Sequence, residues 1–74
     1  MKVVKVKAID DYQLKITFEN KEEKTFDVKP YLNKGIFTEL KEPQVFYAVK
    51  TSLGSITWPS GQDFSPETLY MEGK

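Results

Sequence analysis

Two adjacent carboxylate pairs, Asp10-Asp11 and Glu22-Glu23, are the side chains best suited to acid–base chemistry in this chain. Such chemistry needs a pocket that shifts the pKa of one carboxyl away from that of its neighbour. Each pair falls between runs of alternating apolar residues, where tight hairpin turns in contact with solvent are expected. We therefore interpret both pairs as turn residues and predict no catalytic site.

A second candidate is the segment from Ile56 to Glu67, ITWPSGQDFSPE, which is the densest in residues with special roles. As a binding loop it would present polar and aromatic side chains to a partner. As a strand-to-helix connection it would be shaped by Pro59 and Gly61, with Trp58 and Phe64 packed in the core. Asp63 would then accept backbone N–H bonds. Both interpretations stay open, and the candidate partner-binding residues are Trp58, Ser60, Gln62 and Asp63.

Histidine, cysteine and arginine are absent, and their absence removes much catalytic chemistry. Without cysteine there is no disulfide, no thiolate nucleophile and no sulfur-ligated zinc. Without histidine the usual general base and transition-metal ligand are missing, so Ser60 has no imidazole to activate it. A phosphate-binding loop, a dinucleotide fingerprint and a calcium loop are also missing from the sequence. We predict a protein that is not an enzyme, with no catalytic residues, no metal site and no cofactor.

Charge and hydropathy limit the partners. The chain has 11 basic and 11 acidic residues, so its formal net charge is zero. A neutral chain has no strong field to draw it to nucleic acid or to an anionic membrane, and neither is an expected partner. The longest apolar run, Val45 to Val49, is far shorter than the roughly 20 residues that span a bilayer. Because small secreted domains usually carry disulfides and Met1-Lys2 leads into no signal peptide, we expect a cytoplasmic location.

A length of 74 residues allows a single domain, residues 1–74. Alternating apolar and polar residues from Tyr12 to Phe18 predict a half-buried strand. Weaker alternation at Val3–Ile9 and Glu23–Val28 predicts a strand on each side of it, in an antiparallel meander. Residues Ser52 to Trp58 return to the strand pattern and would add a fourth strand. The expected core-facing side chains of this sheet are Val4, Val6, Leu14, Ile16, Phe18, Phe26, Val28 and Ile56.

Prolines mark the expected helices. Pro30 opens a short irregular piece, and Pro43 suits the first position of a short helix that reaches about Ala48. Ser65 is the expected N-cap of a last helix that begins at Pro66. The predicted fold class is α+β: a small antiparallel, meander-led sheet of about four strands, packed on one face by two or three short helices.

The order of these pieces is familiar. Asp27-Val28 and Tyr31-Leu32 are followed by Gly35-Ile36-Phe37, then by the run GSITWPSGQDF at residues 54–64 and PETLY at residues 66–70. In these residues the chain closely resembles the small bacterial family catalogued as domain of unknown function 2442. The resemblance implies a compact α+β fold, no established activity and no catalytic residues to transfer.

The resemblance also implies a kind of partner. Many relatives are encoded beside another small protein of toxin-like appearance, which suggests an antitoxin or partner-neutralising role. Some relatives carry a helix-turn-helix domain after this one, and this sequence does not continue into one, so their DNA binding is not carried over.

The leading hypothesis is a non-enzymatic protein-interaction module of unknown process, acting as the antitoxin-like partner of a small neighbouring protein. Its expected contact surface is the Trp58–Phe64 loop, the edge strand Val3–Ile9, or both, since an edge strand can pair with another chain. Pairing of that edge with a second copy would give a homodimer. The alternative is a small-molecule or nucleic-acid binding domain with a regulatory role, using the open face of the sheet or the loop.

Overall fold

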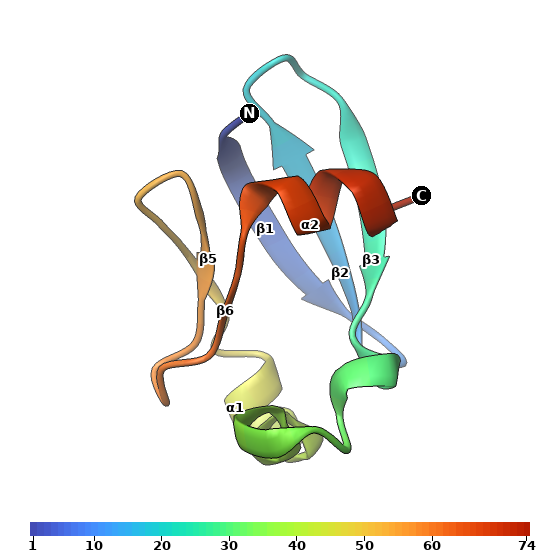
Figure 1. The fold of residues 1–74 in the computed structure, drawn as a ribbon, viewed down its shortest axis with the longest axis vertical. Helices are drawn as coiled ribbons and strands as arrows, with labels where there is room; N and C mark the ends of the chain where they lie inside the picture. The colour runs from blue at the N-terminus through green and yellow to red at the C-terminus, as the bar shows by residue number, and fades with distance from the viewer.

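The computed structural model describes residues 1–74 and arranges them in two antiparallel three-stranded sheets with four short helices (Figure 1). The first sheet has the order β1-β2-β3, with β1 (Val3–Ile9), β2 (Gln13–Phe18) and β3 (Glu23–Asp27). The second has the order β4-β5-β6, with β4 (Lys50–Ser52), β5 (Ser55–Thr57) and β6 (Asp63–Phe64). The α+β class and the N-terminal meander are confirmed.

The prediction of one sheet of about four strands is wrong in this detail. The expected fourth strand, residues Ser52 to Trp58, is broken by a turn at Leu53-Gly54, so the chain folds back as the β4–β5 hairpin. Both turn residues have positive φ, +50° and +82°, which reverses the chain in two residues. The hairpin then pairs with β6 and becomes a second sheet, which meets the first where β4 lies beside β1.

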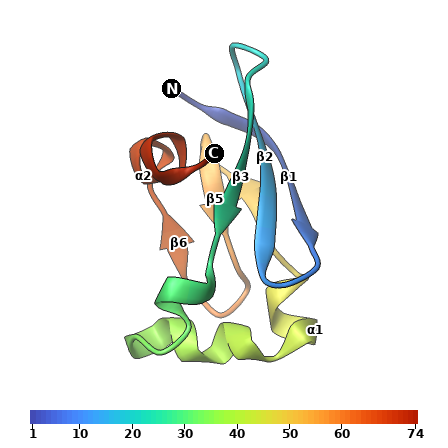
Figure 2. The same ribbon diagram turned by 90° about the vertical axis from the view of Figure 1, so that its right-hand side faces the viewer.

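The helices lie mainly at one end of the two sheets (Figure 2). They are the 3-10 helices η1 (Lys29–Tyr31) and η2 (Gly35–Lys41), then α1 (Pro43–Phe46), and α2 (Pro66–Glu72). The first three close the bottom of the core, while α2 crosses in front of the sheets at the other end (Figure 1). Ser65 caps α2 as predicted, because its hydroxyl accepts a 3.2 Å bond from the N–H of Thr68. No helix is long and apolar enough to cross a bilayer.

One predicted core residue, Val4, is on the solvent side. The β1–β2 register shifts between Val3 and Lys5, so that a bulge reverses the alternation of faces at this point. Val3 is therefore 4% exposed and Val4 57% exposed. Beyond the bulge the expected pattern holds, since Val6 lies opposite the buried Ile16.

The core is a single cluster of buried apolar side chains between the two sheets and the four helices. Its members are Val3, Leu14, Ile16, Phe18, Phe26, Val28, Leu32, Leu40, Phe46, Ile56, Trp58, Phe64 and Leu69. Phe64 of β6 lies at the meeting point of the layers, with ring centroids 4.9 Å from both Phe26 and Phe37. In a chain this small such a shared core is the main source of stability, so both sheets depend on each other.

Candidate functional site

Trp58, the most prominent predicted contact residue, lies in the core. Its side chain is 1% exposed, and its indole Nε1–H donates a 2.9 Å bond to the backbone carbonyl of Phe46. The prediction that Trp58 and Phe64 pack in the core is confirmed, because Phe64 is also buried. In this conformation a partner cannot touch the indole ring.

Gln62 is also enclosed, at 0% exposure, and all its polar atoms have partners. Its Nε2 donates to the carbonyl of Ile36 at 2.7 Å and to Oε2 of Glu39 at 3.0 Å, and its Oε1 accepts a 2.5 Å bond from Ser60 Oγ. These bonds connect the loop after β5 to η2. Gln62 therefore holds the loop to the rest of the fold.

Ser60 and Asp63 are the two exposed members of the predicted set. The Ser60 hydroxyl is committed to Gln62, as described above. The carboxylate of Asp63 accepts no hydrogen bond, so the expectation that it accepts bonds from backbone N–H groups is wrong. The loop turns instead on main-chain bonds, since the N–H of Gly61 donates to the carbonyl of Trp58 at 2.9 Å. Of the four candidate partner-binding residues, only Ser60 and Asp63 face solvent.

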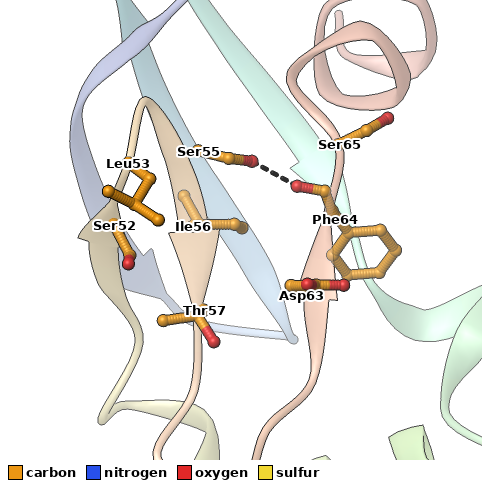
Figure 3. Close-up of a pocket in the computed structure, with 8 residues that line it drawn as sticks. All are labelled: Ser52, Leu53, Ser55, Ile56, Thr57, Asp63, Phe64 and Ser65. Carbon is orange, nitrogen blue, oxygen red and sulfur yellow. Dashed lines mark hydrogen bonds between the residues drawn. The ribbon is translucent and has the colours of Figure 1, made fainter.

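Asp63 borders a polar hollow of about 340 Å³ on the outer side of the second sheet (Figure 3). The hollow is lined by Ser52, Leu53, Ser55, Ile56, Thr57, Asp63, Phe64 and Ser65. Three of its hydroxyls are already bonded inside the protein. Ser55 Oγ donates to the carbonyl of Phe64, Thr57 Oγ1 donates to that of Gln62 at 2.9 Å, and Ser65 Oγ donates to Thr68 Oγ1 at 2.9 Å. The hollow is thus a rigid, hydroxyl-lined surface beside the β4–β5 hairpin. No cluster of His, Cys, Asp or Glu side chains able to hold a metal ion is present.

The tip of the β4–β5 hairpin carries a surface residue that the sequence reasoning missed. Leu53 is fully exposed and has φ +50°, a left-handed conformation that leucine adopts at a cost. The tip lies beside the start of β1, because the N–H of Val3 donates to the carbonyl of Gly54 at 2.8 Å. Leu53 and Val4 therefore flank one hydrogen-bonded pair. The sequence feature that could have predicted this turn is Gly54, which breaks the alternation of apolar and polar residues and suits a two-residue turn.

All four carboxylates are exposed: Asp10 and Asp11 lie in the β1–β2 turn, as predicted, and Glu22 lies in the β2–β3 connection, whereas Glu23 is the first residue of β3. Asp11 accepts a 2.5 Å bond from the Lys29 ammonium, and this bond raises the pKa of Lys29. In the second pair, Glu22 accepts bonds from the Tyr70 hydroxyl at 2.9 and 3.0 Å. Each pair thus joins its turn to a distant part of the chain rather than forming a carboxylate dyad.

These features define a small α+β domain in which two three-stranded sheets share one core. A family model matches residues 3–74, and the chain belongs to the family described as protein of unknown function (DUF2442). No curated protein and no solved structure matches it.

Proposed function

We propose that this protein is a non-enzymatic protein-interaction module, which binds a small neighbouring protein in an antitoxin-like role. The observation that carries the proposal is Leu53, held fully exposed at the tip of the β4–β5 hairpin. The resemblance of the chain to family members encoded beside toxin-like proteins supports the choice of partner.

Leu53 has no role inside the isolated chain that offsets its cost. A left-handed backbone costs a side-chain-bearing residue roughly 1–2 kcal/mol, and asparagine or glycine usually occupies this position of a tight hairpin turn. Leucine gains nothing back here because its side chain is exposed to water. Contact with an apolar surface of another molecule would provide the missing stabilisation.

Val4 extends the same apolar surface. The bulge in β1 turns Val4 outward, and the bond between Val3 and Gly54 holds the bulge against the hairpin tip. The rest of the β1 edge is flanked by β4 and β5. We therefore place the partner contact at Leu53 and Val4 rather than along the whole β1 edge.

The Leu53→Asn variant separates binding from folding. Asparagine tolerates the left-handed conformation, so the free energy of unfolding should rise by about 1 kcal/mol. Affinity for the protein encoded by the adjacent gene, measured by titration calorimetry after co-expression, should fall about tenfold through loss of one anchoring side chain. Because the contact is apolar, moderate salt should change the affinity little.

Met71→Gln is the matched control, since Met71 is an exposed apolar side chain on α2, away from the hairpin. It should bind like the wild type. Equal affinities of wild type, Leu53→Asn and Met71→Gln would refute the proposed contact. If sedimentation showed instead that the wild type associates with itself and that Leu53→Asn abolishes this association, the partner would be a second copy of this chain. The proposal of a neighbouring protein would then be wrong.

A further inference from the structure

An aromatic hollow of about 250 Å³ lies between the β1–β2 turn and α1, at the opposite end of the fold from α2. It is lined by Asp11, Tyr12, Pro43, Phe46 and Tyr47. The Tyr12 and Tyr47 rings meet Phe46 at steep angles, 67° and 86°, with centroids 5.1 and 5.6 Å away. Three rings at such angles form walls around a space rather than a flat stack.

The rim of this hollow is negatively charged. Asp11 borders it directly, and Asp10 lies 3.4 Å from the hydroxyl of Tyr47 at the other side. Burial, and after it the charge of Asp10, raises the pKa of Tyr47, so this ring stays an un-ionised phenol at neutral pH. Aromatic faces beside carboxylates are the surroundings in which organic ammonium groups bind, because the ring quadrupole and the carboxylate charge both attract a cation.

The protein already places one ammonium group at this rim. Lys29 Nζ bonds Asp11 Oδ2 at 2.5 Å, and Lys29 does not line the hollow itself. The carboxylate of Asp11 therefore binds an ammonium group in the folded chain. Asp27 also acts on Lys29, so two acidic side chains, Asp11 and Asp27, share this one cation.

The backbone at the hollow is constrained in an unusual way. Asp11 and Tyr12 have φ of +63° and +57°, and neither is glycine or asparagine. Two successive left-handed residues cost stability, so tertiary contacts must hold them. The Tyr12 hydroxyl donates to the carbonyl of Lys41, and its ring packs on Phe46, which fixes one wall and one carboxylate relative to α1.

We infer that the hollow lined by Tyr12, Phe46 and Tyr47 binds an alkylammonium head group, which the carboxylates of Asp10 and Asp11 complement. This site is separate from the hairpin tip and does not depend on the function proposed above. The cation lies against the aromatic walls and competes with Lys29 for the charge of Asp11. Binding is reversible and involves no covalent step.

Choline is the first probe, titrated into the protein at constant ionic strength while backbone amide NMR shifts are followed. The amides of residues 10–12 and 44–47 should shift saturably. The neutral analogue of choline, with carbon in place of nitrogen, should bind at least about fivefold more weakly, as a cation–π contribution requires. Equal binding of the two compounds, or no saturable shift with choline, would overturn the inference.

Two variants test the named groups. Tyr47→Leu keeps an apolar side chain but removes the aromatic face, and should weaken choline binding about fivefold. Lys29→Gln removes the competing ammonium and should tighten binding about threefold. Glu67→Gln is the control, because Glu67 is an exposed carboxylate in the first turn of α2, and its loss should not change the affinity. A Lys29→Gln affinity equal to that of the wild type would overturn the role of Asp11.

The source of the head group is decided by a third probe, the N-acetyl amide of trimethyllysine. Tighter binding of this compound than of choline assigns the head group to a lysine side chain of a protein. Equal constants assign it to a free small molecule. Either result retains the site.

Discussion

The indole Nε1–H of Trp58 donates to the backbone carbonyl of Phe46, 2.9 Å away and inside the core. This bond joins the residue after β5 to the last residue of α1, twelve positions apart in sequence. The two rings also lie 6.3 Å apart, so one contact supports both the second sheet and the helical end of the core.

Trp58→Phe should lower the free energy of unfolding by about 2–3 kcal/mol. Phenylalanine fills most of the space but leaves the buried carbonyl of Phe46 without a donor, and the lost ring volume adds a smaller cavity cost. Urea denaturation should be followed by circular dichroism rather than by tryptophan fluorescence. Trp58 is the only tryptophan, and the variant lacks it. Tyr47→Phe, at an exposed position, should stay within about 0.5 kcal/mol of the wild type. Equal stabilities of all three proteins would contradict a structural role of the indole N–H.

Gln62→Ala should cost about 2–3 kcal/mol, since the carbonyl of Ile36 and the Ser60 hydroxyl lose their partner and a fully buried side chain is removed. Gln62→Glu is the sharper test. It removes the donor and places a carboxyl beside the carbonyl of Ile36 and the carboxylate of Glu39. That carboxyl holds its proton more tightly in the folded than in the unfolded state, so the variant should recover stability as the pH falls from 7 to about 4.5. If the free energy of unfolding of Gln62→Glu differed from that of the wild type by the same amount over this pH range, the placement of residue 62 beside Ile36 and Glu39 would be contradicted.

The loss of stability at alkaline pH should depend on the ionisation of two tyrosines, Tyr31 and Tyr70. The hydrogen bond to Glu72, and then burial, raises the pKa of Tyr31, and the hydrogen bond to Glu22 has the same effect on Tyr70. A phenol whose pKa is raised in the folded state stabilises that state while it is protonated. This contribution to the free energy of unfolding is complete below the unfolded-state pKa of about 10 and is lost as the pH rises through the folded-state pKa. The free energy of unfolding should therefore fall above about pH 10. In the double variant Tyr31→Phe, Tyr70→Phe this fall, measured by urea titration, should be shallower; an unchanged slope would contradict the assignment.

Gly73→Ala should destabilise the chain by about 1–3 kcal/mol, because overpacking against backbone cannot relax easily. A Cβ at residue 73 would lie 2.6 Å from the carbonyl oxygen of Leu69 and 3.0 Å from Cβ of Lys24. The shift required would also disturb Lys74, whose backbone exchanges two bonds, 2.8 and 2.9 Å, with Thr25 of β3. Thermal unfolding and amide exchange at Thr25 measure both effects.

Gly35→Asn is the control for this prediction. Gly35 has φ +48° and open space around its Cα, and asparagine tolerates that conformation. Its melting temperature should remain close to that of the wild type. A Gly73→Ala protein as stable as this control would show that the chain end is not held against β3.

Local patterns predicted the local elements well. The alternation from Tyr12 to Phe18 placed Leu14, Ile16 and Phe18 in the core, where they are found. Ser65 and Pro66 marked the start of α2, since a cap and a proline act within one turn of the chain. Such signals depend on a few neighbouring residues, and a sequence contains them in full.

Features set by contacts between distant segments were not predictable in this way. Val4 alternates correctly with Val6, but a bulge held against the hairpin tip reverses its face. Gln62 is an ordinary polar residue in the sequence, yet the approach of η2 provides the carbonyl and carboxylate that allow its complete burial. The Leu53 turn was missed because leucine is a poor signal for a left-handed conformation.

The sequence by itself determined the α+β class, the three-stranded meander, the capped last helix and membership of a family, since each depends on short-range pattern or on residue identity. Only the tertiary structure decided which side chains remain available for binding. It buried Trp58 and Gln62, exposed Leu53 and Val4, and brought Asp10 and Asp11 to the aromatic rings near α1. The physical reason is that burial and proximity arise when two sheets and four short helices close on one core, and no single segment contains that information.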